Sequence, residues 1–206
     1  MARNPAYCKL KTHSHLTLLK DLAEVRSGYS FRSRVEEDPG GDLVVFQIRS
    51  LEQRGAVQAE DGMRLYFPEV SPSLLLRRGD VLFAARGMRN VGAVIDFDPD
   101  RAIASGQLLW MRPKSKSIEP AYLAWWLNQQ PAQQFFESHK RGTRMPIITR
   151  SSLLELPVSV PSRDLQMKFV ELDQLHRQER ELTARIQEKR EEHYEGRVAR
   201  LMKGNL

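Results

Sequence analysis

Residue patterns that would support catalysis are missing from this sequence. The segment Asp98 to Asp100 comes nearest to the Asn/Asp-Pro-Pro-aromatic motif of a DNA methyltransferase, but it lacks the second proline and the aromatic residue. No G-x-x-x-x-G-K-S/T loop is present to bind a nucleotide phosphate. His13 and His15 form a spaced pair, and the other three histidines fit no zinc-protease pattern. We therefore expect a binding protein with no catalytic residues, metal or cofactor.

Basic and polar side chains that can bind nucleic acid are concentrated in predicted turns. Lys140 to Pro146 is the most basic loop, and Arg89 lies at the tip of a predicted hairpin. Arginine can donate two hydrogen bonds to guanine, asparagine pairs with adenine, and lysine, serine and threonine bind phosphates. The predicted DNA-binding residues are Arg49, Ser50, Arg54, Arg89, Asn90, Lys140, Arg141, Thr143 and Arg144.

The charge distribution favours the same interpretation. The chain has 206 residues and a formal net charge of +6. Residues 101–150 hold 8 basic and 2 acidic residues, a surplus that is typical of a phosphate-facing surface. For any single basic residue, a solvated surface position is an equally good interpretation. Trp110, Trp125 and Trp126 lie in strand and helix patterns, so we expect them to pack in the core.

Cysteine content and hydropathy predict the compartment. Cys8 is the only cysteine, which excludes an internal disulfide and a cysteine-built zinc site. The N-terminal region is basic but lacks the apolar core of a signal peptide, and the longest apolar run, Ala121 to Leu127, is too short to span a membrane. We expect a soluble, cytoplasmic protein with no membrane partner.

The elements that must position the basic turns mix strands and helices without regular βαβ alternation, which predicts an α+β head. Thr17 is expected to cap a helix that ends near Gly28. Val81 to Phe97 is predicted to be a hairpin, and Pro120 and Pro131 each begin a further helix. Other strands are predicted at Leu43 to Ile48, Arg64 to Phe67, Leu108 to Met111 and Val158 to Val160.

Arg163 to Lys203 is predicted to be one long helix, because it contains no proline and a single glycine. Apolar residues recur at spacings of three and four and line one face: Leu172, Leu175, Leu182 and Ile186. A helix this long and charged cannot bury itself against a small domain, so we predict that this face packs on a partner helix. Polar residues interrupt the same register, which leaves a helix folded back on the head as an alternative.

Five motifs occur along the chain in a definite order: Leu19 to Val25 with Ser27-Gly28, Arg78 to Phe83 with Gly87 and Gly92, Ile118 to Leu123, Gly142-Thr143 with Ile147, Leu153 and Leu156 to Val158, and Val160-Pro161 with Leu165-Gln166. Their order and spacing resemble the specificity (S) subunits of type I restriction-modification systems, here in half-length form. One departure is Leu165, since an acidic residue normally precedes the glutamine.

The resemblance implies a globular target-recognition domain at residues 1–161 and a coiled-coil spacer and dimerisation helix at residues 162–206. Family members usually have two of each. The implied protein is a non-catalytic homodimer that reads one part of a bipartite double-stranded DNA site with each domain. It would dock the methyltransferase (M) and restriction (R) subunits, which carry out the chemistry. Base-contacting residues vary among family members, so none is transferred to this sequence.

Two other classes of function remain possible. One is a stand-alone DNA-acting enzyme or target domain with unrecognised chemistry, which metal-dependent cleavage by the purified chain would support. The other is a coiled-coil adaptor that does not bind DNA and whose positive charge is incidental. Neighbouring genes for an Asn-Pro-Pro-aromatic methyltransferase and a helicase-like restriction subunit would favour the S-subunit interpretation.

Overall fold

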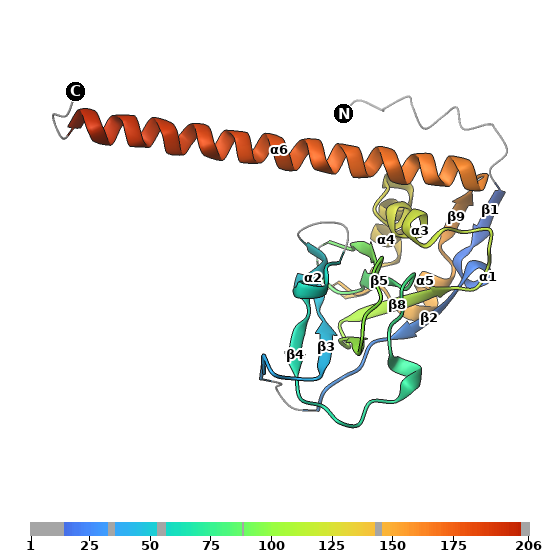
Figure 1. Cartoon of the computed structure of the whole chain (residues 1–206). Helices are drawn as coiled ribbons and strands as arrows, with labels where there is room; N and C mark the ends of the chain where they lie inside the picture. The colour runs from blue at the N-terminus through green and yellow to red at the C-terminus, as the bar shows by residue number, and fades with distance from the viewer. Residues whose placement is uncertain (1–14, 33–35, 53–56, 88, 143–145, 203–206) are drawn as a thin grey trace. The chain divides into compact units, whose positions relative to one another are not determined.

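The computed structural model describes residues 15–32, 36–52, 57–87, 89–142 and 146–202 (Figure 1). Contacts divide the chain into two compact units, Met1–Phe169 and Val170–Leu206. The elements, in which η marks a short 3-10 helix, follow in the order β1 (His15–Leu18), α1 (Leu19–Leu22), β2 (Ala23–Ser27), β3 (Leu43–Phe46), α2 (Ile48–Glu52), η2 (Ala59–Asp61), β4 (Met63–Leu65), η3 (Pro72–Leu74), β5 (Val81–Ala84), β6 (Gly92–Val94), β7 (Ala102–Ala104), β8 (Leu108–Pro113), α3 (Pro120–Leu127), α4 (Gln130–His139), α5 (Arg150–Leu154), β9 (Pro157–Val160) and α6 (Arg163–Met202). This mixture confirms the predicted α+β class with a long C-terminal helix.

The strands of the described residues form three sheets. β1 pairs with β9, a four-stranded sheet has the order β2-β8-β5-β6, and a three-stranded sheet has the order β4-β3-β7. β3 and β7 are parallel, and the other pairs are antiparallel. β5 and β6 form the predicted hairpin, with Val81 opposite Val94 and Phe83 opposite Gly92.

The two larger sheets join where β7 leads into β8. The backbone N–H of Tyr29 donates to the carbonyl oxygen of Ala104 at 2.7 Å, and that of Gly28 donates to Leu108 at 3.0 Å. A Cβ atom on Gly28 would lie 2.1 Å from the carbonyl oxygen of Ser105, so a side chain at position 28 would prevent this crossing. The end of β2 therefore passes tightly over the β7–β8 turn and links the two sheets.

Each of the larger sheets contributes to a buried core. Phe46, Leu82, Ile95 and Trp110 belong to one cluster. Trp110 is fully buried, as the sequence predicts, and the guanidinium carbon of Arg112 lies 4.9 Å from the centre of its ring. A second cluster surrounds the three-stranded sheet and contains Leu43, Val45, Met63, Leu65 and Ile103.

A tight turn before β5 is held by a buried ion pair. Asp80 is 1% exposed, and its carboxylate accepts hydrogen bonds from Arg112 at 2.7 and 2.8 Å. The same carboxylate accepts the backbone N–H of Arg77 at 2.8 Å. The hydrogen bond with Asp80 raises the pKa of Arg112, which keeps the guanidinium charged. The turn thereby fixes where β5 begins.

The helix predicted from Thr17 to Gly28 is wrong. The structure has a single helical turn, α1, between strands β1 and β2. Thr17 pairs with Val158 of β9, and Ala23–Ser27 pairs along β8. Within β2, Ala23 and Val25 are buried while Glu24 is exposed, which is the period of a strand. The apolar spacing that indicated a helix is therefore divided between one turn and a strand.

The prolines at the starts of α3 and α4 act as predicted. Pro120 and Pro131 each occupy one of the first two helical positions, where a missing N–H costs little. On α3, Trp125 stacks on Phe169 with ring centres 4.7 Å apart, and the Tyr122 hydroxyl donates to the carbonyl oxygen of Ser159 at 2.9 Å. The first turns of α6 are thus packed against the head within the first unit.

The second unit consists of the remainder of α6. Leu172, Leu175, Leu182 and Ile186 are between 53% and 65% exposed. Charged side chains pair along the helix, with Arg177 to Asp173 at 2.6 Å and Lys189 to Glu192 at 2.5 Å. Such exposed pairs are screened by solvent and contribute little to stability. In the part of the chain that the structure describes, no helix has the length and apolar character needed to cross a membrane.

Candidate nucleic-acid interface

The described ends of the most basic segment, Arg141 and Pro146, lie beside the end of the β5–β6 hairpin. The backbone N–H of Ile148 donates to Ala85 at 2.8 Å, and that of Gly87 donates to Pro146 at 3.1 Å. Ile147 forms bridges with both Arg86 and Arg141. Gly87 and Gly142 have φ values of 99° and 88°, which favour glycine. Two loops separated by about fifty residues of sequence therefore form one surface, on which Arg86, Arg89 and Arg141 are exposed.

The predicted DNA-binding residues occupy several kinds of position. Arg49 on α2 is exposed, as are Arg89 and Arg141. The Lys140 side chain forms an ion pair with Glu137 and is 11% exposed. Three of the predicted residues lie outside the described residues: Arg54, Thr143 and Arg144.

Ser50 and Asn90 lie inside the fold. Ser50 is 5% exposed, and its hydroxyl donates to the carbonyl oxygen of Asp61 at 2.7 Å. Asn90 is 2% exposed, and its Nδ2 donates to Ala84 at 2.8 Å, which closes the hairpin loop. These bonds give both side chains a structural role. Their contact with DNA stays a prediction.

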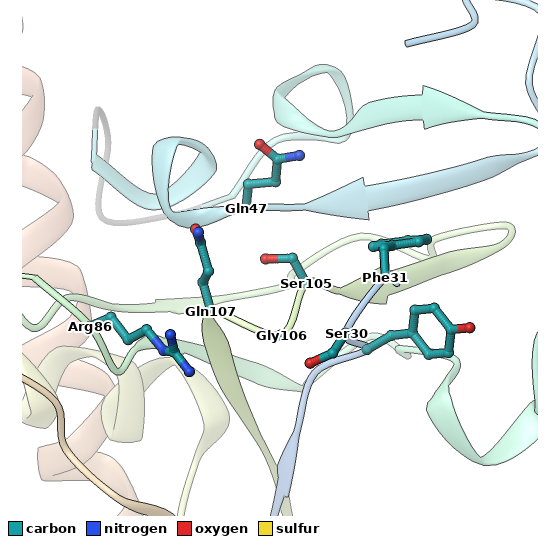
Figure 2. A pocket seen from close by; sticks show the side chains of 8 residues that line it. Ser30, Phe31, Gln47, Arg86, Ser105, Gly106 and Gln107 are labelled. Carbon is teal, nitrogen blue, oxygen red and sulfur yellow. The ribbon is translucent and has the colours of Figure 1, made fainter. Parts of the chain in front are cut away.

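A cleft adjoins the basic loops, and it forms where several strands end (Figure 2). Gln47 follows β3, Arg86 follows β5, and Gly106 and Gln107 form the turn between β7 and β8. We call it the strand-end cleft, and its lining residues are Tyr29, Ser30, Phe31, Gln47, Arg86, Ser105, Gly106 and Gln107.

The backbone around the strand-end cleft is fixed by hydrogen bonds. The N–H of Ser105 donates to the carbonyl oxygen of Phe46 at 2.8 Å, and the N–H of Leu108 donates to Ser105 at 2.9 Å. A Cβ atom on Gly106 would lie 2.3 Å from the Ser30 hydroxyl oxygen, so glycine allows the turn to approach Ser30. The cleft is therefore held in a single backbone arrangement.

Side chains of the strand-end cleft present neutral amide groups and one guanidinium. Arg86, Gln107 and Ser30 are exposed. The Nε2 atom of Gln47 lies 3.6 Å from the Met63 sulfur, which is a weak acceptor. Ser105 is 9% exposed, and its hydroxyl has no hydrogen-bond partner among the described residues. This combination can recognise groups that both donate and accept hydrogen bonds.

Sequence reasoning missed Arg86, Gln47 and Gln107. The glutamines carry no charge, and sixty positions separate them in the sequence. Parallel pairing of β3 with β7 brings them to one place. Polar residues that directly follow predicted apolar strands are the signal that could have found them. In the described residues, no group of three or more His, Cys, Asp or Glu side chains could hold a metal ion.

An α+β unit with arginine and amide side chains at joined strand ends fits the class of nucleic-acid-recognition domains. The family profile described as "Type I restriction modification DNA specificity domain" matches residues 17–191. The chain therefore belongs to this family. A comparison with curated protein sequences gave no match.

Solved structures of type I restriction-modification proteins share this fold. A chain from a study of complex assembly and conformational transition of the type I R-M system aligns with a TM-score of 0.68 and 21% identity over 96% of this chain. The HsdS subunit of Thermoanaerobacter tengcongensis aligns with a TM-score of 0.57 and 20% identity over 82%. The type I S subunit of M. genitalium aligns with a TM-score of 0.52 and 15% identity over 80%.

The alignments differ in how much of each relative they include. This chain covers 48% of the first structure and 39% of each of the other two. It therefore spans less than half the length of the solved chains that it matches.

Proposed function

We propose that this chain is the DNA-recognition subunit of a type I restriction-modification system. In this proposal residues 1–161 form one target-recognition domain and residues 162–206 form one spacer helix. The observation that carries it is the match of the specificity-domain family to residues 17–191. The chain itself performs no catalysis. It selects the sequence at which a methyltransferase subunit and a restriction subunit act, in the cytoplasm where the DNA is present.

The DNA-binding role is supported by the exposed arginines beside the strand-end cleft. Arg86, Arg89 and Arg141 lie on loops that pair through Ile147 and Pro146. Arginines on one surface attract the phosphate backbone at long range and can also donate two hydrogen bonds to a guanine. The adjoining amides add groups that read bases. The surface thus combines affinity for any DNA with the means to distinguish sequences.

Assembly is supported by the apolar face of α6. Four aliphatic side chains on it remain more than half exposed: Leu172, Leu175, Leu182 and Ile186. Exposed aliphatic residues at spacings of three and four are typical of a helix that packs on another helix. We propose that a second copy of this chain supplies that helix. A pair of chains then carries two recognition domains, and each domain reads one half of a bipartite site.

One site-selection experiment tests the proposed function. The purified chain, alone and together with a type I methyltransferase subunit, is mixed with a pool of random duplex DNA, and bound duplexes are sequenced. We expect one interrupted sequence to be enriched, with binding that weakens as salt rises. Failure to enrich any sequence would exclude a recognition role. Cleavage of DNA by the chain alone with Mg²⁺ would instead support the enzyme alternative.

A further inference from the structure

We propose that the strand-end cleft reads base edges in the major groove, with Gln107 bound to an adenine and Arg86 bound to a guanine. This inference rests on the proposed function, because it assigns sequence readout to a recognition domain. Figure 2 shows Gln107 extending toward the segment that carries Gln47, with Arg86 to one side and Phe31 to the other.

Two polar side chains of the strand-end cleft have unused hydrogen-bonding groups, unlike several arginines elsewhere in the head. Arg112 is bound to Asp80, Arg101 is paired with Asp42, and Arg150 donates to the carbonyl oxygen of Val25 at 2.6 Å. Arg86 and Gln107, in contrast, form no side-chain hydrogen bond or ion pair with any described residue. Their donors and acceptors are available to a ligand.

The buried hydroxyl of Ser105 is a second, independent observation. A buried polar group without a partner is unfavourable, and most such groups in proteins are bound to another group or to water. Ser105 lines the cleft and is 9% exposed, and no described residue satisfies its hydroxyl. We expect this hydroxyl to gain a partner when the cleft is occupied.

Base edges fit this chemistry better than phosphates do. A phosphate oxygen only accepts hydrogen bonds, whereas an adenine edge presents the N7 acceptor and the N6 donor together. The amide of Gln107 offers one acceptor and two donors, which match that edge. The guanidinium of Arg86 matches the two acceptors N7 and O6 of guanine. Arg89 and Arg141 on the adjoining loops remain available for phosphates.

Rigid placement makes the readout specific. Gln107 and Gly106 form the β7–β8 turn, which the Leu108 to Ser105 hydrogen bond closes at 2.9 Å. Arg86 directly follows Ala85, whose carbonyl oxygen accepts the backbone N–H of Ile148 at 2.8 Å. Because both backbones are held by hydrogen bonds before DNA binds, only the side chains can adjust to a mismatched base, which limits how well they can pair with it.

The decisive variant is Gln107→Glu, because a carboxylate accepts from cytosine N4 and repels adenine N7. The full chain with its methyltransferase selects duplexes from a random pool. We expect the sequence selected by Gln107→Glu to have cytosine in place of one adenine in each half-site. This variant should prefer cytosine to adenine at that position by about 5- to 100-fold. Gln107→Ala should lose the base preference at that position. Equal thermal unfolding of both variants and the parent shows that the head remains folded.

Arg86→Ala tests the guanine assignment, and Arg78→Ala is its matched control. Arg78 is exposed and precedes β5, whereas Arg86 follows it. Arg78→Ala therefore removes one positive charge, as Arg86→Ala does, but at the opposite end of the strand. We expect Arg86→Ala to relax one guanine position while Arg78→Ala leaves the selected sequence unchanged. A uniform loss of affinity with the guanine preserved would identify Arg86 as a phosphate contact and overturn this assignment.

The outcomes separate this inference from the proposed function. If the parent chain enriches no sequence, the proposed function fails. If the parent enriches a sequence and both Gln107 variants enrich the same sequence with the same affinity, the recognition role stands and the cleft is not the reading surface. If the cleft binds a small molecule instead of DNA, both Gln107 variants should likewise enrich the parent's sequence with unchanged affinity.

Discussion

The side chain of Gln166 accepts a hydrogen bond from the backbone N–H of Glu119 at 2.9 Å, although 47 positions separate the two residues. Gln166 lies in the second turn of α6 and is fully buried. Its Nε2 also donates to the carbonyl oxygens of Ser117 at 2.7 Å and Pro161 at 2.9 Å. One amide thus joins the start of α6 to the N-terminus of α3 and to the end of β9.

Replacing Gln166 by leucine should destabilise the head. The change keeps a similar volume but removes one buried hydrogen bond, to Pro161, and two partly buried ones, with Ser117 and Glu119. Water can replace the partly buried bonds, whereas an unsatisfied buried group costs roughly 1–3 kcal/mol, so we expect a loss of about 1–3 kcal/mol. For a chain of this size, the Tm should fall by about 3–10 °C in a thermal unfolding experiment.

Gln187→Leu is the matched control for that change. Gln187 is on the same helix, but its side chain is exposed and bonds only to Glu191 at 2.9 Å. Its replacement leaves no buried group unsatisfied, so the Tm should move by less than about 2 °C. If the two leucine variants unfold at the same temperature, the Gln166 bonds do not stabilise the head.

Removing charge from the basic loop should reduce both DNA affinity and its dependence on salt. The logarithm of the binding constant falls as the logarithm of the salt concentration rises, and each lost phosphate contact makes this negative slope shallower by about one unit. We therefore expect Arg141→Ala combined with Arg144→Ala to make the slope shallower by about two units. Titration of a labelled duplex at several salt concentrations measures both quantities.

Arg77→Ala with Arg78→Ala removes the same net charge from the turn before β5. Both side chains are exposed. If this control pair changes the slope as much as the loop pair does, the effect reports overall charge and the basic loop has no special position at the DNA. A change in the preferred sequence of the loop variant would instead show that these arginines contact bases.

Local sequence signals predicted much of the fold. Pro120 and Pro131 marked two helix starts, and the turn after Ala84 marked the hairpin, because proline fixes φ and glycine permits the positive φ of a tight turn. The segment Ala23–Ser27 was assigned wrongly because its partner, β8, lies far along the sequence. Pairing with that strand outweighs the helical spacing that Val25 shares with the preceding Leu18, Leu19 and Leu22. β7 was missed because Ala102–Ala104 is only three residues long and gives no pattern of its own.

The site was harder to predict than the fold. Arg89 and Arg141 were chosen from charge and turn chemistry, and the structure leaves both exposed. Sequence alone could not separate them from Asn90, which is turned inward to bond with Ala84. Gln47 and Gln107 carry no signal until the parallel pairing of β3 and β7 places them in one cleft. Exposure and non-local proximity are properties of the folded chain.

Placing charge on the apolar face of α6 should prevent the chains from pairing. Leu175 and Leu182 are both more than half exposed in the single chain, so Leu175→Glu with Leu182→Glu should leave the head folded. In a paired coil the same carboxylates would be buried beside each other, which is strongly unfavourable. We expect light scattering to show a dimer for the parent at tens of micromolar and a monomer for this variant. Near-UV circular dichroism reports whether the head is intact.

Ala184→Glu with Gln187→Glu is the control for pairing. With 3.6 residues per turn, these positions lie on the side of the helix away from Leu175 and Leu182. The control adds negative charge to the same segment but should remain dimeric. A parent protein that is monomeric both alone and with its methyltransferase would contradict the pairing model, whatever the variants do.

The symmetry of a paired assembly predicts the form of its DNA site. Two identical heads related by a twofold axis must read the same half-sequence on opposite strands. We therefore expect an inverted repeat that is interrupted by a spacer of fixed length. Site selection with the parent chain measures this directly, and an asymmetric site would show that two identical heads do not share the DNA.

The length of the paired helices should set the length of that spacer. A heptad inserted after Ile186 adds about 10 Å of helix, since the rise is about 1.5 Å per residue, and it approximately preserves the apolar face. B-DNA rises about 3.4 Å per base pair, so the preferred spacer should lengthen by roughly three base pairs. Three base pairs also rotate one half-site by nearly a third of a helical turn, which should lower affinity. Site selection on the parent and the insertion variant compares the spacers, and an unchanged spacer in a folded, dimeric variant would show that α6 does not set the distance.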